Sequence, residues 1–495
     1  MKYVMALDQG TTSSRAVIFD QTGRTVAAQG IEFAQIYPKP GWVEHDPRAI
    51  LESQVAAARL AVELSGIDVK RIEAVGITNQ RETTLLWDRK TGETLFNAIV
   101  WQCRRTAPIV ERLKRDGLGS IITNRTGLIP DAYFSGTKLE WLLENVAGAR
   151  ARAERGELCF GTVDSYLTYM LTKEKRHVTD MTNASRTMLF NIFEKKWDPE
   201  LLKMMDVPAS LLPEVVDSSG IVGTLDKSIL GHEIPVAALA GDQHAALFGQ
   251  GCFTPGMCKN TYGTGCFVLM NTGKTPVRSP GRLLTTVGWC LDGKVTYALE
   301  GSVFVAGAVV KWLRDEMQLI KTAGETAELA ASVPDNAGVY FVPAFTGLGA
   351  PTWDMYARGL IVGLTRGAGR AHVVRAALEA IAYQSADVIG AMQRDSGISM
   401  PLLRVDGGAS ANDFLMQFQS DILGAEVIRP SVIESTALGA AMLAGRAVGL
   451  WSDADMAKIQ TVSRAFTPHM DGAQRERLLR DWKRAVARAE GWAEE

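Results

Sequence analysis

Four short turns, each beside an apolar strand, constrain the fold of this 495-residue chain more than any other feature. Each contains glycine together with Asp, Ser or Thr, and such residues end strands by forming tight turns. The turns are residues 8–15 (DQGTTSSR), 241–243 (GDQ), 261–265 (TYGTG) and 406–412 (DGGASAN). One such turn alone is an ordinary connection. Four of them at strand ends in one chain predict a shared binding site.

The first turn has the chemistry of a phosphate site. Gly10 is followed by four hydroxyl residues, so N–H groups and hydroxyls of a tight turn can donate to phosphate oxygens. Arg15 adds a cation able to bind phosphate through two hydrogen bonds. Asp8, at the strand end, can hold Mg²⁺ through water, because Mg²⁺ dehydrates reluctantly. The alternative is a plain hairpin turn, and the chain contains no P-loop motif (G-x-x-x-x-G-K-[ST]).

The other three turns extend this interpretation. Residues 261–265 can donate to phosphate in the same way, and residues 406–412 join a strand to a helix whose N-terminus favours an anion. Asp242 can accept the proton of a hydroxyl group while Gln243 orients that group. The alternative for Asp242 is a turn carboxylate that caps the helix beginning near residue 245.

The expected elements form an α/β pattern with two similar series. The first series has strands at residues 3–8, 15–19, 26–33 and 72–78 and a helix at 47–63. The later series has strands at residues 235–240, 257–265, 266–271 and 402–405 and helices at 308–319 and 370–393. A chain of this length predicts two domains of roughly 200–250 residues each.

Composition excludes several classes of protein. Hydrophobic residues make up 46% and charged residues 22%, and the net charge of -2 argues against binding to nucleic acid or to an anionic membrane. No apolar run is long enough for a secretory signal or a spanning helix, which predicts no membrane insertion. The six cysteines form no C-x-x-C pair and are expected to be reduced core residues of a cytoplasmic protein. Residues 474–495 predict a solvated amphipathic helix, with a partner-binding tail as the alternative.

In the same order along the chain, these turns resemble motifs of the FGGY carbohydrate kinases, an actin-like ATPase family, and within it the glycerol kinases. Residues 78–83 (TNQRET), 133–141 (YFSGTKLEW) and 347–363 also match, so the resemblance covers nearly the whole chain. The Arg81-Glu82 pair and Trp101 distinguish the glycerol kinases from the sugar kinases of this family. The resemblance implies ATP-dependent, Mg²⁺-assisted phosphorylation of glycerol to sn-glycerol 3-phosphate, in glycerol uptake and catabolism.

The resemblance also implies roles for individual residues. Asp242 would be the general base, with Asp8 beside the metal and Arg15 on the transferring phosphoryl group. Glycerol would be held by Arg81, Glu82, Trp101, Tyr133, Asp242, Gln243 and Phe267. The nucleotide would be contacted by Thr11, Thr12, Ser13, Arg15, Thr264, Gly307, Lys311, Gly408 and Asn412. For each aromatic residue alone, core packing is the alternative.

The implied fold is α/β, with two ribonuclease-H-like domains of the actin/hexokinase type at residues 1–249 and 250–495. The first would carry the glycerol site and the first phosphate loop, and the second the nucleotide site. Closure of the cleft between them would exclude water, which is a competing phosphoryl acceptor. Relatives form dimers and tetramers, so a homo-oligomer is expected, although no interface can be identified in the sequence.

Two segments depart from the family pattern. Lys311 stands where many relatives have glutamine. Residues 226–233 (DKSILGHE) lack the glycines and the arginine with which some bacterial relatives bind fructose 1,6-bisphosphate. Ser228 stands where some Gram-positive relatives have a phosphorylated histidine, and His232 is out of register with that position. Neither form of control is therefore expected here.

Three other functions stay open. The first is an FGGY kinase for a ketose, a sugar acid or a longer polyol, against which the Arg81-Glu82 pair argues. The second is an actin-like ATPase that switches a partner, which would require a further domain. The third is a catalytically silent regulatory homologue, which the presence of Asp8, Arg15 and Asp242 opposes.

Overall fold

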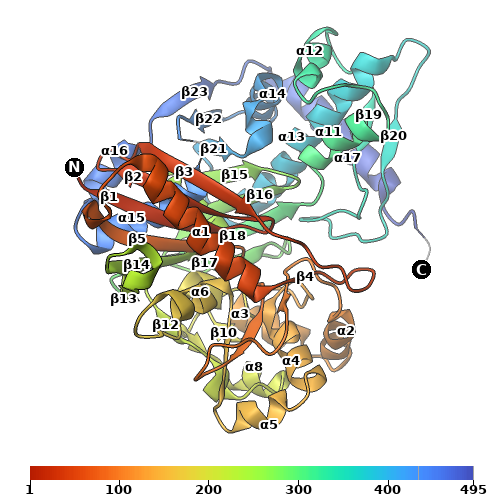
Figure 1. The fold of residues 1–495 in the computed structure, drawn as a ribbon. Coiled ribbons are helices and arrows are strands. Elements are labelled where there is room, and N and C mark those ends of the chain that lie inside the picture. The colour runs from red at the N-terminus through yellow and green to blue at the C-terminus, as the bar shows by residue number, and fades with distance from the viewer. Residues whose placement is uncertain (433, 494–495) are drawn as a thin grey trace.

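The computed structural model describes residues 1–432 and 434–493 and has a mixed α/β fold. Within these residues, one sheet of 13 strands crosses the molecule in the order β23-β22-β21-β15-β16-β18-β17-β13-β14-β5-β1-β2-β3. Helices cover it on both faces (Figure 1). The two ends of this sheet repeat one connectivity, which confirms the predicted α/β fold with two similar parts.

The first half of the sheet contains β1 (Tyr3–Gln9), β2 (Ser13–Asp20), β3 (Thr25–Glu32), β5 (Ile72–Asn79) and β14 (Ile234–Gly241). β1, β2 and β3 pair antiparallel, whereas β5 lies parallel to β1 and β14 lies parallel to β5. The side chains of Met5 and Val4 point to opposite faces and enter two separate cores. β1 is therefore apolar from Tyr3 to Leu7, as expected of a strand covered on both sides.

Helix α1 (Pro47–Ser65) crosses from β3 to β5 and has clear sequence signals at both ends. Asp46 accepts a hydrogen bond of 2.9 Å from the backbone N–H of Arg48, and Pro47 occupies the first helical position. Gly66 ends the helix with a left-handed backbone (φ 64°). These signals explain why the predicted helix at residues 47–63 has nearly the observed bounds.

The second half repeats this arrangement with β15 (Cys258–Tyr262), β16 (Cys266–Gly273), β18 (Lys294–Val303), β21 (Leu402–Asp406) and β22 (Glu426–Pro430). The first three are antiparallel, and β21 and β22 continue the sheet in parallel. β13 (Ser219–Leu225) and β17 (Leu284–Leu291) join the two halves through the single pair Ser219–Leu291. Helix α13 (Arg370–Ser396) packs against β16 and β18.

Two sequence expectations are wrong in detail. The strand at residues 235–240 belongs to the first half and not to the later series, because β14 pairs with β5. The helix expected at residues 308–319 ends earlier, as α11 (Gly307–Asp315). Gln318 has a left-handed backbone (φ 52°), which a continuing α-helix does not allow.

Two helices cross where the halves meet. α10 (Asp242–Gly249) packs against α15 (Ser435–Ala447), and α15 also lies on β1, β5 and β14 of the first half. A Cβ atom at Gly439 would lie 1.8 Å from the carbonyl oxygen of Ala245, so the two backbones are in direct contact. The C-terminal part of the chain thus returns to cover the N-terminal sheet (blue beside red in Figure 1).

Between β5 and β14 the chain first builds a lobe at the bottom of Figure 1 and then returns to the main sheet as β13. The core of the lobe includes Phe134, Leu139 and Phe160, and α4 (Ser135–Asn145) is almost entirely buried within it. The loop that precedes α4 carries Tyr133, and Trp101 packs on the same core, so this lobe presents two of the predicted site residues.

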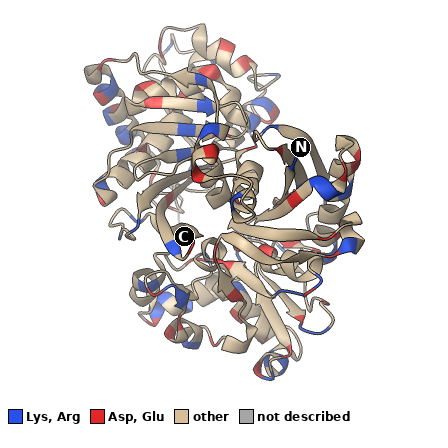
Figure 2. Ribbon diagram, turned by 90° about the vertical axis from the view of Figure 1, so that its left-hand side faces the viewer, with Lys and Arg blue, Asp and Glu red and all other residues tan. Residues whose placement is uncertain are grey.

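The cysteines and the charged C-terminal helix follow the sequence expectations. All six cysteines are free and buried. α17 (Gly472–Ala489) has an exposed charged face and buries Trp482, Ala485 and Ala489, while residues 494 and 495 of the predicted C-terminal segment lie outside the described residues. None of the helices described is long and apolar enough to cross a membrane. Lys and Arg alternate with Asp and Glu over the molecule (Figure 2).

Candidate active site

The strands of the first half bring two of the predicted turns to the same edge of the sheet. β1, β5 and β14 are parallel neighbours, with Asp8 opposite Thr78 and Gly241 opposite Asn79. Their carboxyl ends therefore lie together. Asp242, directly after β14, lies close enough to raise the pKa of Asp8 by charge repulsion.

The strands of the second half bring the other two turns together. Thr261, at the end of β15, lies opposite Asp406, at the end of β21. Lys259 connects this pair to the first half, because its Nζ donates to Oε1 of Gln243 and, at 2.9 Å, to Oγ1 of Thr261. All four turns thus surround one place between the halves.

Arg81 holds the carboxylate of Asp242. The distance between Arg81 Nε and Asp242 Oδ1 is 3.1 Å. The two terminal nitrogens of Arg81 lie 2.6 and 3.0 Å from the carboxylate oxygens of Glu300, and Nη2 lies 3.5 Å from the hydroxyl of Tyr133. Burial opposes the charge of Arg81, but Glu300 and Glu82 keep its pKa well above the usual value. Arg81 is thus a fixed cation beside Asp242.

Arg186 and Glu300 complete a buried group of four charges and were not anticipated from the sequence. Arg186 Nε lies 2.6 Å from Glu82 Oε1, and its Nη2 lies 3.1 Å from Glu300 Oε1. Burial alone would raise the pKa of Glu300, but Arg186 and Arg81 hold it well below its usual range. Glu300 is therefore held ionised between two fixed guanidinium groups. No local motif identifies Glu300, which lies in the apolar strand β18.

Glu82 has a strained backbone at this site. Its φ is 61°, in the left-handed region that non-glycine residues rarely adopt. Its carbonyl oxygen accepts hydrogen bonds from Thr84 Oγ1 at 3.0 Å and from Ser135 Oγ at 3.1 Å, while Arg186 holds its carboxylate. Burial raises the pKa of Glu82. Such strain persists where the surroundings fix the conformation, and it is common at functional sites.

Two aromatic side chains lie beside these charges. The rings of Trp101 and Tyr133 pack edge to face with centroids 5.7 Å apart. The indole N–H of Trp101 donates to Thr11 Oγ1 at 3.0 Å, so it connects Trp101 and Tyr133, which we call the acceptor side, to the turn at residues 8–15. Phe267 lies on β16 opposite Thr261 and, within the described residues, has no ring contact with either of these two. The structure therefore groups two of the three predicted aromatic residues.

The loop that carries Tyr133 is held by a buried lysine. Lys138 Nζ donates to the carbonyl oxygens of Ala132 at 2.9 Å, of Phe134 at 3.1 Å, and of Tyr133 itself. Burial lowers the pKa of Lys138 to about 7. Three carbonyls that would otherwise lack donors are satisfied, which fixes the backbone at Tyr133.

Asp242 is the first residue of α10, and its two carboxylate oxygens differ. Oδ1 accepts a hydrogen bond of 2.7 Å from the backbone N–H of Gln243 and also faces Arg81. Oδ2 has no hydrogen bond within residues 1–432 and 434–493. The capping interpretation is wrong, because α10 begins at Asp242 itself, with Gly241 as its N-cap and no side-chain cap hydrogen bond. The proton-acceptor role stays a prediction, for which one oxygen is anchored and the other is open.

Asp8 and Arg15 lie opposite each other on β1 and β2. Arg15 Nη2 lies 2.7 Å from Glu434 Oε1, just before α15. Burial raises the pKa of Asp8 to about 7, with Arg15 opposing and Asp242 and Glu434 adding to the rise. The excess of carboxylates over cations around Asp8 would be relieved by a divalent cation.

The donor set fits Mg²⁺ better than a tightly caged metal. No group of three or more His, Cys, Asp or Glu side chains positioned for a metal occurs among the described residues. Mg²⁺ in kinases takes one or two carboxylates and fills its other positions with water and phosphate oxygens. Asp8, with Asp242 nearby, meets that requirement.

A cavity of about 720 Å³ lies on the other side of this centre. Apolar side chains such as Leu378, Ile381 and Leu415 form part of its wall. The predicted nucleotide residues that line it are Thr264, Gly307, Lys311, Gly408 and Asn412. Those of the first loop, Thr11, Thr12, Ser13 and Arg15, do not line it. The predicted nucleotide-binding residues thus fall into two groups, one that lines this cavity and one in the first loop.

Close backbone contacts shape the mouth of this cavity. A Cβ atom at Gly307 would lie 2.6 Å from the carbonyl oxygen of Gly263. Gly407 has a φ of 82°, and its Cβ would lie 2.5 Å from the carbonyl oxygen of Tyr262, whereas Gly408 has open space around it. Asn412 caps α14 (Asp413–Leu423) through the N–H of Leu415 at 3.0 Å. Gly407, which the sequence interpretation did not single out, is therefore the position in this turn that requires glycine.

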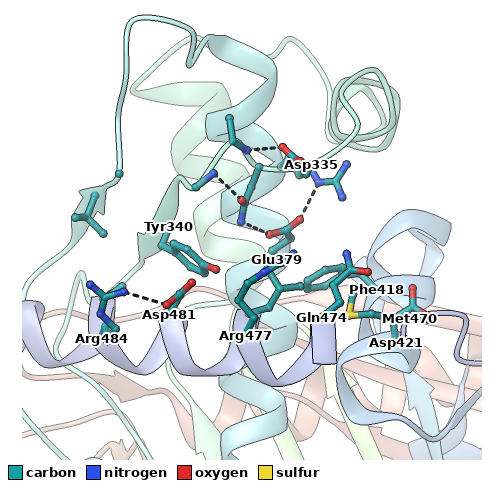
Figure 3. A pocket seen from close by; sticks show the side chains of 18 of the residues that line it. Asp335, Tyr340, Glu379, Phe418, Asp421, Met470, Gln474, Arg477, Asp481 and Arg484 are labelled. Carbon is teal, nitrogen blue, oxygen red and sulfur yellow. Dashed lines mark hydrogen bonds and ion pairs between the residues drawn. The ribbon is translucent and has the colours of Figure 1, made fainter. Parts of the chain in front are cut away.

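A second cavity, of about 800 Å³, lies away from this centre between α13, α14 and α17 (Figure 3). Its acidic side chains already have partners: Glu379 accepts from Arg375 Nε at 2.8 Å, and Asp481 accepts from Arg484 at 3.0 Å. None of the predicted site residues lines it. The candidate active site is therefore the centre around Asp242 together with the 720 Å³ cavity.

Comparison with protein families decides the class of the chain. The FGGY family of carbohydrate kinases matches with its N-terminal domain at residues 3–249 and with its C-terminal domain at residues 258–448. The chain belongs to this family. The chain is 62% identical to a glycerol kinase of Caldanaerobacter subterraneus subsp. tengcongensis over 495 residues, and the match covers 100% of both chains. It is 59% identical to glycerol kinase 2 of Thermotoga maritima over 493 residues, 99% of each.

Solved structures share the whole fold of this FGGY kinase. The crystal structure of Plasmodium falciparum glycerol kinase with ADP is 35% identical, with a TM-score of 0.94 over 99% of this chain and 98% of the other. Xylulose kinase from Lactobacillus acidophilus has a TM-score of 0.90 at 24% identity, over 99% of each chain. The second likeness concerns the fold alone.

Proposed function

We propose that this FGGY kinase transfers the γ-phosphoryl group of ATP to glycerol, which yields sn-glycerol 3-phosphate and ADP. The arrangement at Asp242 carries the proposal, because one oxygen is fixed by Arg81, which also contacts Tyr133, and the other oxygen is open. Full-length relatives at 59–62% identity are glycerol kinases, which supports glycerol over a sugar.

The acceptor side can recognise a small polyol. Glycerol has little apolar surface, so its affinity must come from several hydrogen bonds made at once. Arg81, Glu82, Asp242 and Gln243 supply charged and amide groups and Tyr133 a hydroxyl, while Trp101 and Phe267 would supply an apolar wall. An acceptor that lacks one hydroxyl would leave a buried polar group unpaired, which is strongly unfavourable.

Proton and phosphoryl transfer follow from this geometry. The terminal hydroxyl gives its proton to Oδ2 of Asp242, and its oxygen forms a bond with the γ-phosphorus. The bond between that phosphorus and the bridging oxygen of ADP breaks in line with the attack. Arg15 and the N–H groups of the first loop stabilise the negative charge on the transferring group. Phe267 and the residues of the nucleotide cavity keep their predicted binding roles.

The metal is assigned to Asp8. Mg²⁺ held there through water would neutralise charge on the β- and γ-phosphates. Arg15, paired with Glu434 at 2.7 Å, must share or exchange that partner when the phosphates arrive. Asp8, Arg15 and Asp242 form the catalytic group in this proposal.

We also propose three further properties of this protein. They are a division into domains at residues 1–249 and 250–495, a homo-oligomeric state and a cytoplasmic location. Control by fructose 1,6-bisphosphate or by histidine phosphorylation is expected to be absent, given residues 226–233. Sedimentation velocity tests the oligomeric state, and inhibition of the pure protein by the bisphosphate would contradict the last expectation.

The decisive experiment measures ADP release with Mg-ATP and a panel of acceptors. The panel is glycerol, dihydroxyacetone, xylulose, ribulose, gluconate, erythritol and no acceptor. Asp242→Asn keeps the shape of the side chain but removes the base, and a lost general base lowers kcat by about 10²–10⁴-fold. Asp116→Asn, at an exposed aspartate, serves as the matched control and should behave as wild type.

The outcomes are distinct. Activity on glycerol that is lost in Asp242→Asn and kept in Asp116→Asn supports both the reaction and the base. Activity on a sugar would preserve the fold and the mechanism but overturn the assignment of the Arg81-Glu82 pocket. ATP hydrolysis that is independent of every acceptor would favour an ATPase switch.

A further inference from the structure

Lys259 places an ammonium group in the interior, between the acceptor side and the nucleotide side. It lies on β15 and is completely buried. Burial of a cation is unfavourable unless hydrogen bonds and opposite charges replace its hydration. Burial accordingly lowers the pKa of Lys259, while the carboxylates of Asp406 and Asp242 act in the opposite direction. A leucine or methionine would fill this space at lower cost, so the charge calls for a reason other than packing.

The partners of the ammonium supply that reason. Nζ donates to Oε1 of Gln243 and to Oγ1 of Thr261. An ammonium has donors only, whereas a primary amide has a carbonyl acceptor at one corner and an NH₂ donor at the other. Lys259 therefore compels the carbonyl of Gln243 to face it. The NH₂ group turns away and has no hydrogen bond within residues 1–432 and 434–493.

We propose that Lys259 is a positioning residue that fixes the amide of Gln243 with its NH₂ group free to donate to an acceptor hydroxyl. The inference rests on the proposed kinase function, in which Gln243 stands beside the base. A hydroxyl that gives its proton to Asp242 or Glu82 can only accept at its oxygen, so it needs a donor from the amide. An unrestrained amide samples both orientations, and only one of them meets that need.

Lys259 and Gln243 lie on different elements, β15 and α10, and share no motif, which is why the sequence did not reveal the pair. The rival explanation is that Lys259 merely joins β15 to α10. That role predicts a loss of stability when the lysine is removed, with no special relation to Gln243. A double-mutant cycle separates the two explanations, because it asks whether the effect of Lys259 requires the amide.

The cycle compares wild type, Lys259→Met, Gln243→Ala and the double variant by initial rates with Mg-ATP. The acceptor is whichever compound the wild-type enzyme phosphorylates in the panel, so a failure of the glycerol assignment does not affect the test. Loss of one hydrogen bond predicts a KM for the acceptor about tenfold higher in Gln243→Ala and about three- to tenfold higher in Lys259→Met. The double variant should stay within about twofold of Gln243→Ala, and the KM for ATP should change less than about twofold in each.

Two further variants keep the test interpretable. Lys114→Met, at an exposed lysine that pairs with Glu111, makes the same substitution away from the site and should leave the KM for the acceptor within about twofold of wild type. Lys259→Gln can face Gln243 with either end of its amide, so it should raise that KM although it keeps a hydrogen-bond partner. Effects that multiply in the double variant, or an unchanged KM together with a lower Tm, would overturn the proposal. Failure of both Lys259 variants to fold would likewise favour the purely structural role.

Discussion

Arg81 and Glu300 are joined by two hydrogen bonds, of 2.6 and 3.0 Å, although they come from opposite halves of the chain. Arg81 follows β5 of the first half, and Glu300 lies within β18 of the second. A bidentate pair fixes both the position and the plane of a guanidinium group. The side chain that holds Asp242 is thus oriented before any ligand arrives.

Glu300→Gln should destabilise the protein and weaken acceptor binding. The change keeps the shape of the side chain but leaves the guanidinium groups of Arg81 and Arg186 with one buried carboxylate fewer. Breaking a buried ion pair by removing one partner costs about 3–5 kcal/mol. Urea denaturation measures the free energy of unfolding, and the KM for glycerol should rise while the KM for ATP stays nearly constant.

The control for Glu300→Gln is Glu52→Gln. Glu52 pairs with Arg48 at 2.6 Å on the exposed side of α1. Exposed pairs contribute less than about 1 kcal/mol, so this variant should be nearly neutral. Equal effects of the two substitutions would show that the buried group does not organise the site.

The sequence predicts what is local and misses what is distant. The four turns can be recognised in the sequence because glycine, hydroxyl and acidic residues determine the backbone conformation within a few positions, as in residues 8–15. Glu300 and Arg186 cannot, because their charges are balanced only by partners from other elements. Read alone, Glu300 interrupts an otherwise buried strand, and nothing in residues 294–303 says that two guanidinium groups compensate for it.

The same limit applies to the fold. The sequence places the strand at residues 235–240 in the later series, because nothing in it shows that its partner is β5, much earlier in the chain. Hydrophobic patterning gives a strand but not its neighbour. The return of α15 to the first half is likewise invisible in the sequence, since small residues along a helix indicate close packing without naming the surface. The roles of individual site residues stay predictions.

Gly439→Ala should force the two crossing helices apart. An added Cβ would lie 1.8 Å from the carbonyl oxygen of Ala245 in α10, and neither backbone can yield without moving its helix. The overlap should cost about 1–3 kcal/mol, despite the higher helix propensity of alanine. Because α10 and α15 lie between the halves, the variant should also close less than wild type when glycerol and a non-hydrolysable ATP analogue bind.

Small-angle scattering with and without both ligands measures that closure. Gly220→Ala is the matched control, because a Cβ there has no heavy atom within 4 Å. It should leave both the stability and the change in radius of gyration as in wild type. A Gly439→Ala protein of normal stability and normal closure would mean that the helices tolerate separation.

Asp164→Asn should change how stability depends on pH. Burial raises the pKa of Asp164 to about 7, against hydrogen bonds from Thr162 and Thr179, and the charge of Asp180 adds to the rise. In the unfolded chain the group ionises near its usual value of 3.8, so between about pH 4 and 7 the unfolded state binds fewer protons. This group therefore lowers stability as pH rises through that window, by up to about 1.4 kcal/mol per pH unit, and its contribution levels off above 7.

Urea denaturation of wild type and Asp164→Asn at pH 5 and pH 8 tests this sign. The asparagine variant should gain stability relative to wild type at the higher pH, since Thr162 and Thr179 can rotate their hydroxyls to suit an amide. Asp116→Asn, at an exposed position, should follow wild type at both pH values. A relative loss of stability at pH 8 would show that the buried carboxylate is ionised and well solvated in the folded protein.

Lys138→Met should weaken acceptor binding, because it removes the side chain that holds the loop of Tyr133. Its ammonium satisfies the carbonyl oxygens of Ala132, Tyr133 and Phe134, and methionine fills a similar volume without any donor. An unsatisfied buried carbonyl costs about 1–3 kcal/mol, so the loop should shift toward conformations in which other donors or water reach these oxygens. Tyr133, which packs on Trp101 and lies 3.5 Å from Arg81, would then lose its fixed position.

The expected result of Lys138→Met is a higher KM for glycerol with little change in the KM for ATP. Tyr133→Phe supplies the comparison, because it keeps the ring and removes only the hydroxyl. A parallel rise in both KM values would instead indicate that Lys138 supports the fold as a whole and not the acceptor side.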